Sequence, residues 1–211
     1  MKSALAAVVL ACASPAFADA QLWVEAGAGT NITKRVEVDL GPQVRFDQDM
    51  SRFAAFLPEV NIRYRAKRWL RVGGGYRLEY ERDNNDELVV RHRVSVDVRL
   101  RTELGAARVD YRAMLMEQVR HDTGDPYRAV IRNRLDVSYR AFRPWIPYAG
   151  VESFHLLGDF DELTYHKLRL SLGVLRGGRE HDLEMFLRAE LHADDRDPTF
   201  YIVGLGYHYQ L

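Results

Sequence analysis

The sequence predicts an all-β fold: a transmembrane antiparallel up-and-down β-barrel of ten to twelve strands. In the stretch Leu88–Arg101, apolar and polar residues alternate over fourteen positions, which gives a strand two unlike faces. Similar segments of 11–14 residues recur along the chain, and a tilted transmembrane strand needs about 9–11 residues. Long acidic connections alternate with short, often basic ones. Membrane barrels have two such distinguishable ends.

Composition excludes several other classes of protein. The 211 residues contain 30 lysines and arginines and 30 aspartates and glutamates, so net charge indicates no nucleic acid partner. No run of eighteen apolar residues occurs, although 47% of residues are hydrophobic. A membrane-spanning helix is therefore not expected, whereas strands with one polar face remain compatible with a membrane.

The N-terminus has the pattern of a secretory signal peptide. Lys2 supplies a positive charge, Ala4–Ala11 an apolar core, and Ala16-Phe17-Ala18 a small-residue cleavage site. We therefore expect residues 1–18 to be a signal peptide and residues 19–211 to form a single barrel domain. Such a chain would be exported to the outer membrane of a Gram-negative bacterium.

Two details of processing stay open. Cleavage after Ala20 is an alternative to cleavage after Ala18. The chain's one cysteine, Cys12, lies inside the signal segment, so the mature chain would carry no thiol. Because Val9-Leu10-Ala11 precedes it, acylation of Cys12 in a lipoprotein is a second alternative.

The first three candidate strands are the least regular. Leu22–Ala28 is short and glycine-rich, with Trp23, Glu25 and Gly27 on one face. Val36–Phe46 alternates well but carries Pro42 on its apolar face, so a bulge or weak pairing is expected there. Phe53–Arg65 follows and ends in an alternating segment.

The later strands alternate clearly, with one exception. The strand that ends near Leu156 follows the turn Phe142–Pro147, and its facing is not assigned. Short glycine-bearing or basic turns such as Gly177-Gly178 separate the hairpins. The remaining strands are Trp69–Glu81, Leu88–Arg101, Leu104–Arg120, Arg128–Ala141, Tyr165–Leu175, Asp182–His192 and Tyr201–Leu211.

The strand number is set by the connections. Five acidic loops imply ten strands from Val36 to Leu211, and Leu22–Ala28 would make eleven. Bacterial barrels usually have an even number. We therefore expect Leu22–Ala28 to be a periplasmic or lumenal extension, or the barrel to have twelve strands.

The end of the chain and the aromatic residues indicate the partners. The last strand places Tyr207, Tyr209 and Leu211 on one face, which predicts recognition by the barrel-assembly machinery. Aromatic residues toward strand ends predict interfacial girdles in outer-membrane lipid. They are Trp69, Tyr76, Tyr80, Trp145, Tyr148, Tyr201, Tyr207 and Tyr209.

The charged face predicts the lining of the lumen. It has two interpretations: a narrow, porin-like pore that favours small anionic solutes, or an ion-pair ladder that fills the barrel and closes it. The predicted lumen residues are Arg63, Arg65, Arg77, Glu79, Arg91, Arg93, Asp97, Arg99, Arg101, Arg108, Asp110, Arg112, Arg132, Arg134, Asp136, Arg140, Arg169, Arg188 and Glu190.

Catalysis has one weak candidate. Ser153 and His155 are two residues apart and so share a strand face, which allows a lipid hydrolase acting on the lipid-facing wall. No third, orienting residue is identifiable. The sequence contains no cysteine–histidine metal pattern, phosphate loop or dinucleotide fingerprint, so no catalytic residue, metal or cofactor is expected.

Four short motifs resemble a known family. They are Gln21-Leu22-Trp23, Val72-Gly73-Gly74-Gly75-Tyr76-Arg77, His92-Arg93 and Asn133-Arg134-Leu135. The chain resembles domain of unknown function 2490, a family of uncharacterised bacterial outer-membrane β-barrels, over nearly its whole mature length. The resemblance implies the fold and the outer-membrane location, and it implies no catalytic residues.

Overall fold

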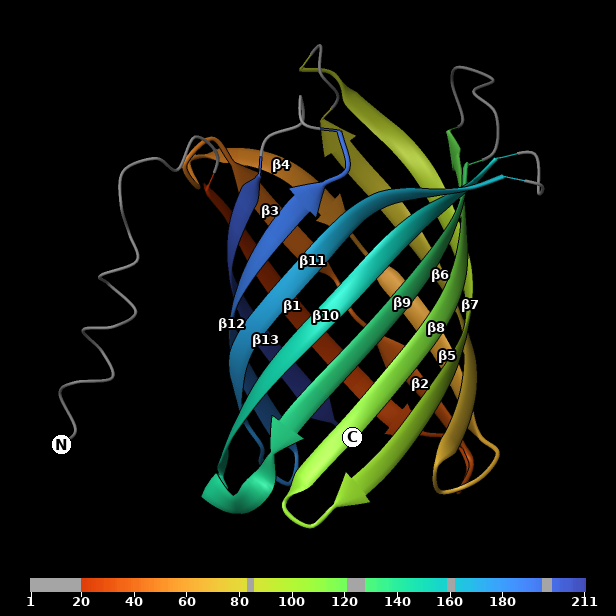
Figure 1. The fold of residues 1–211 in the computed structure, drawn as a ribbon, viewed down its shortest axis with the longest axis vertical. Helices are drawn as coiled ribbons and strands as arrows, with labels where there is room; N and C mark the ends of the chain where they lie inside the picture. Colours follow the sequence, from red (N-terminus) through yellow and green to blue (C-terminus); the bar gives the residue numbers. More distant parts are fainter. Residues whose placement is uncertain (1–19, 83–85, 121–127, 159–161, 195–198) are drawn as a thin grey trace, which may run out of the picture.

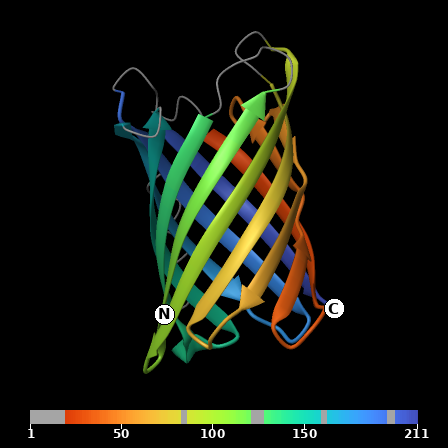
Figure 2. The ribbon, with the colours of Figure 1, turned by 90° about the vertical axis from the view of Figure 1, so that its right-hand side faces the viewer.

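The computed structural model describes residues 20–82, 86–120, 128–158, 162–194 and 199–211, and these form one closed β-barrel (Figures 1 and 2). The predicted signal peptide lies outside the described residues. The one helical element in the described part is the short 3-10 helix η1 (Arg140–Phe142). No described helix is long and apolar enough to cross a membrane.

The barrel wall consists of thirteen strand segments in one sheet. The first five are short, apart from β1: β1 (Ala20–Asn31), β2 (Val36–Leu40), β3 (Gln43–Asp47), β4 (Arg52–Leu57) and β5 (Glu59–Arg65). The others are long: β6 (Leu70–Arg82), β7 (Leu88–Leu104), β8 (Ala107–Arg120), β9 (Arg128–Tyr139), β10 (Trp145–Gly158), β11 (Glu162–Arg176), β12 (His181–His192) and β13 (Phe200–Gln210).

Two wall strands are interrupted by proline, so thirteen segments make eleven strands. Gly41-Pro42 separates β2 from β3, and Pro58 separates β4 from β5. Proline has no N–H to donate to the ladder. Its carbonyl still pairs: Pro42 accepts a hydrogen bond of 3.0 Å from the Ala26 N–H, and Pro58 accepts one of 3.0 Å from Leu78.

The barrel closes through a parallel pair. β1 lies alongside β13 in the same direction, from Ala20 opposite Tyr201 to Gly29 opposite Gln210. All the other described strand pairs are antiparallel. The segment Leu22–Ala28 is therefore a wall strand, and both expectations for it, an extension or a barrel of twelve, are corrected. A parallel closing pair removes the need for an even strand number.

The two rims differ. At one end, which we call the short-turn rim, brief connections such as 66–69 and 105–106 join the strands, and β13 ends there. β6, β8, β10 and β12 end at the opposite end of the barrel, which we call the long-loop rim (Figure 1). β1 begins at the long-loop rim because its first residue pairs with the start of β13.

The strand that predicted the fold shows how the two faces are used. On β7, Val94, Val96 and Val98 point outward, and Val96 is 57% exposed. Ser95 and Asp97 point into the barrel, and Asp97 is 5% exposed. Because successive side chains point to opposite faces, this alternation gives an apolar outer wall and a polar interior.

Candidate functional site

The interior of the barrel is crowded with charged side chains. Arg65 is exposed at the short-turn end of β5, and Arg140 lies in η1, where it pairs with Glu103. The other predicted lumen residues all occupy inward-facing strand positions and form ion pairs: Arg63, Arg77, Glu79, Arg91, Arg93, Asp97, Arg99, Arg101, Arg108, Asp110, Arg112, Arg132, Arg134, Asp136, Arg169, Arg188 and Glu190.

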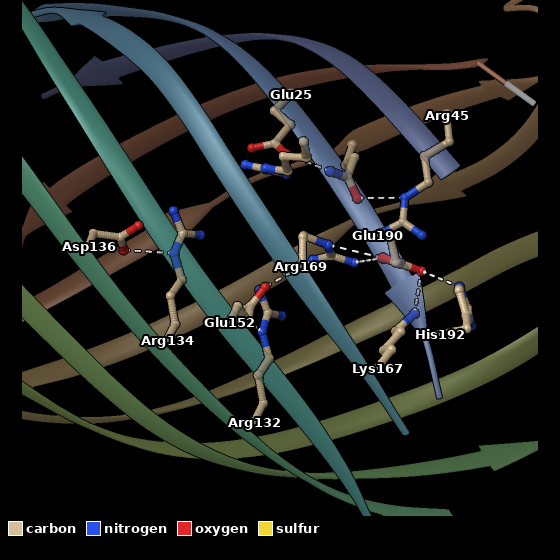
Figure 3. A network of polar contacts seen from close by, with 12 residues as sticks. Glu25, Arg45, Arg132, Arg134, Asp136, Glu152, Lys167, Arg169, Glu190 and His192 are labelled. Atoms are coloured by element: carbon tan, nitrogen blue, oxygen red, sulfur yellow. Dashed lines mark hydrogen bonds and ion pairs between the residues drawn. The ribbon is translucent and has the colours of Figure 1, made fainter. Parts of the chain in front are cut away.

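The most deeply buried network spans β9 to β12 (Figure 3). Glu152 accepts hydrogen bonds from Arg132 and from Arg169 Nη1, the latter at 3.0 Å. Arg169 Nε also donates to Glu190 at 3.0 Å, and Lys167 Nζ donates to the same carboxylate at 2.6 Å. Every carboxylate in this chain of contacts therefore has two cationic partners.

Strand register explains these contacts. Glu152 lies directly opposite Arg169, and Arg169 directly opposite Glu190. Opposite charges that face each other across neighbouring strands stabilise a sheet. A buried ion pair needs such complete pairing, because an unpaired charge in the interior is costly.

Apolar side chains also occupy the lumen in the half next to the long loops. Trp23 near the start of β1 and Ile202 near the start of β13 form a buried cluster with Phe186. The Arg188 guanidinium stacks 3.6 Å from the centre of the Phe186 ring. Gly204 leaves room for that ring, because a Cβ at this position would overlap it. The other buried apolar residues are Ala55, Leu57, Val89, Met114, Met116 and Phe154.

Cavities occupy other parts of the interior. A cavity of about 230 Å³ lies beside Trp23, Met114 and Met116. A second, of about 330 Å³, includes Arg140 of η1 in its lining and so reaches the short-turn rim. A third, of about 620 Å³, lies across the barrel against β1, β2 and β13 and is lined in part by His208. The interior is thus emptier toward the short turns.

Strand β10 contributes lumen residues that sequence reasoning missed. Glu152 and Phe154 are buried inside the barrel, and Tyr148 donates a hydrogen bond to Glu184 there. Tyr148 was expected in an interfacial girdle, and that expectation is corrected. The inward face of β10 is largely apolar, so apolar and polar residues do not alternate along this strand and its two faces could not be told apart from the sequence. The available signal was Glu152, which is the one aspartate, glutamate, lysine or arginine from 145 to 158.

Ser153 and His155 lie on the outer wall of β10. Ser153 lies opposite Asn133 on the neighbouring strand β9. The Asn133 Oδ1 accepts a 2.8 Å hydrogen bond from the Tyr111 hydroxyl. The His155 ring contacts Tyr165, with ring centres 5.7 Å apart. Within the described residues, His155 Nδ1 has no hydrogen-bond partner. The described residues therefore supply no carboxylate that binds Nδ1 of this histidine and orients it toward the serine.

A closed all-β barrel with an apolar outer wall and an ion-paired interior defines a barrel of the outer-membrane type. The chain belongs to the family described as protein of unknown function (DUF2490), whose model matches residues 20–178. Among solved structures, LpxR from Salmonella typhimurium is similar, with a TM-score of 0.51, 10% identity, and 83% of each chain covered. At this identity the likeness shows the fold alone. No curated protein matches the chain.

Proposed function

We propose that this protein resides in the bacterial outer membrane as a structural barrel whose lumen is closed in the half next to the long loops. The apolar outer wall of strands such as β7 supports the location, because lipid must face it. The proposal selects the ion-pair ladder over the open pore among the two interpretations of the charged face.

One observation carries this proposal: most wall strands carry inward-facing side chains that are almost inaccessible to water. Ile202 on β13 and Glu79 on β6 are each 1% exposed. An open water channel would expose the side chains that line it. Buried inward residues come from strands on every side: Trp23 (β1), Gln43 (β3), Leu57 (β4), Asp97 (β7), Met114 (β8), Glu152 (β10), Arg169 (β11) and Arg188 (β12).

The energetics also favour a closed lumen. Moving Arg169 aside to open a path would break its contacts with Glu152 and Glu190. Separating one partner from a buried ion pair costs about 3–5 kcal/mol. A cost of this size favours the closed state by a factor of about 100 or more, because every 1.4 kcal/mol is tenfold.

Conductance across planar bilayers tests the closed lumen. We expect the folded wild-type protein to give no stable ion conductance. The triple variant Trp23→Ala, Met116→Ala, Phe154→Ala removes three of the large side chains that close the lumen and should conduct. The matched control Val98→Ala, Leu115→Ala, Val137→Ala truncates three outward-facing residues and should stay closed. Stable conductance by the wild-type protein would refute the proposal.

Cell fractionation tests the location. We expect the protein to sediment with the outer membrane and to migrate faster on a gel before heating than after it, as folded barrels do. Recovery in the soluble fraction would contradict the outer-membrane location.

A further inference from the structure

The cavity of about 330 Å³ beside β7, β8 and β9 is strongly basic. Six arginines line it: Arg99, Arg101, Arg108, Arg112, Arg134 and Arg140. Three carboxylates oppose them, from Asp110, Asp136 and Glu184. The volume is in the range of small-molecule sites, and the charge of the lining favours an anion.

Four of these arginines are held in a way that leaves their outer nitrogens available. Arg99 binds Asp97 through Nε at 2.7 Å, and Arg134 binds Asp136 through Nε at 2.7 Å. Arg101 and Arg108 both bind Asp110 through Nε, at 2.6 and 2.7 Å. A guanidinium has five N–H donors, and four of them are on the two Nη atoms. In the described part of the chain, no Nη atom of these four residues has a protein partner.

The deeper arginines are held differently. Arg169 uses Nε and both Nη atoms on Glu152 and Glu190. Its side chain is 9% exposed, whereas the side chains of Arg99, Arg101, Arg108 and Arg134 are 26–34% exposed. The Arg169 guanidinium is therefore saturated by carboxylates, whereas the guanidinium groups of these four cavity arginines keep donors for a ligand.

Strand register places like charges side by side at this wall. Arg71, Arg99, Arg112 and Arg134 are direct cross-strand neighbours on β6, β7, β8 and β9. Like charges directly opposite each other destabilise a sheet. An anion bound among them would offset this repulsion.

The opposite side of the lumen has the reverse charge. The cavity of about 620 Å³ is lined by six carboxylates against Arg63, Arg77 and Arg99. Charged walls of opposite sign set up a field across the lumen, and this field directs an anion toward β7–β9. The six carboxylates are those of Glu25, Glu37, Asp39, Glu59, Asp182 and Glu184.

We propose that the cavity beside β7–β9 binds a small, soluble molecule that carries a phosphate or diphosphate group and enters from the short-turn rim. Guanidinium forks match phosphate oxygens and give charge-assisted hydrogen bonds. This site goes beyond the closed structural barrel proposed above and does not depend on it, because entry from the short-turn rim needs no open path through the long-loop half.

Calorimetric titration of the detergent-folded protein with pyrophosphate tests the site. We expect saturable binding that weakens with added salt, and much weaker binding of the monoanion acetate. The double variant Arg101→Gln, Arg108→Gln should bind pyrophosphate at least about tenfold more weakly, since it loses two charge-assisted donors. The matched control Arg65→Gln, Arg68→Gln removes two exposed charges at the same rim and should bind like the wild type.

Absence of saturable binding by the wild type, or an equal loss in both double variants, would overturn the proposal. Gel mobility before heating verifies that each variant is folded. If the glutamine variant does not fold, the double variant Arg101→Lys, Arg108→Lys replaces it. This variant keeps both positive charges but loses the guanidinium forks. Unchanged affinity for pyrophosphate would then overturn the proposal. Conductance together with pyrophosphate binding would contradict the closed lumen alone. Absence of both conductance and binding would contradict this site alone.

Discussion

Replacing Glu152 by glutamine should destabilise the barrel far more than the same change at an exposed ion pair. Glu152 is the carboxylate partner of Arg132 in the described structure, whereas Arg169 keeps Glu190 as a second partner. The change therefore leaves one buried guanidinium uncompensated, which costs about 3–5 kcal/mol. The amide oxygen of glutamine still accepts one hydrogen bond, worth about 1 kcal/mol. We expect a net loss of about 2–4 kcal/mol in the free energy of unfolding.

Urea unfolding of the barrel in lipid vesicles measures this loss. With a slope of about 2 kcal/mol per molar urea, the midpoint should fall by about 1–2 M. Glu103→Gln is the matched control, because Glu103 pairs with Arg140 at the short-turn rim and its side chain is 58% exposed. Such exposed pairs contribute at most about 1 kcal/mol. Equal midpoints for the two variants would refute the idea that burial makes the β9–β12 network structural.

Three further outcomes are expected. Val96→Arg places a charge on the outer wall of β7 and should lower stability in vesicles by about 2–4 kcal/mol, with Val96→Leu as the control; equal stability would argue against lipid at this face. Leu22→Cys with Val203→Cys should form a disulfide across the β1–β13 pair, seen as altered mobility on a non-reducing gel. Leu22→Cys with Tyr209→Cys should not, and a cross-link there would contradict the register. Ser153→Ala should leave any phospholipid or lipid A hydrolysis by the wild type unchanged; its loss would support the lipid hydrolase.

The alternation in Leu88–Arg101 predicted the fold because a barrel wall separates two environments. A period of two is imposed on every strand that has an apolar outside and a polar inside, so local sequence is enough to detect it. The arginines of β7 and its one aspartate, Asp97, were assigned to the interior on this ground alone. The family resemblance agrees with the family match over residues 20–178.

What could not be predicted depends on contacts between distant residues. Alternation says which face a residue occupies, but it does not say which strand lies beside it. No local sequence pattern indicates that Ala20–Gly29 pairs with Tyr201–Gln210. An even number of strands was therefore expected from the sequence, whereas this parallel pair closes a barrel with an odd number. On β10, Phe154 and Tyr148 fill the lumen, so the binary pattern failed where the interior itself is apolar. The ion-pair partners likewise follow from register, which sequence patterns do not fix.

The parallel pair of β1 and β13 has a consequence for the folding order. Neighbours elsewhere in the wall are joined by turns or loops, so their hairpins can form while the rest of the chain is unfolded. The β1–β13 contact joins residues about 180 positions apart and carries the largest loop-closure entropy. Contacts of high sequence separation are slow to form. We therefore expect the first strand to keep its ladder groups unsatisfied on one edge until the last strand is in place. Closure of the cylinder would then be the final step of folding.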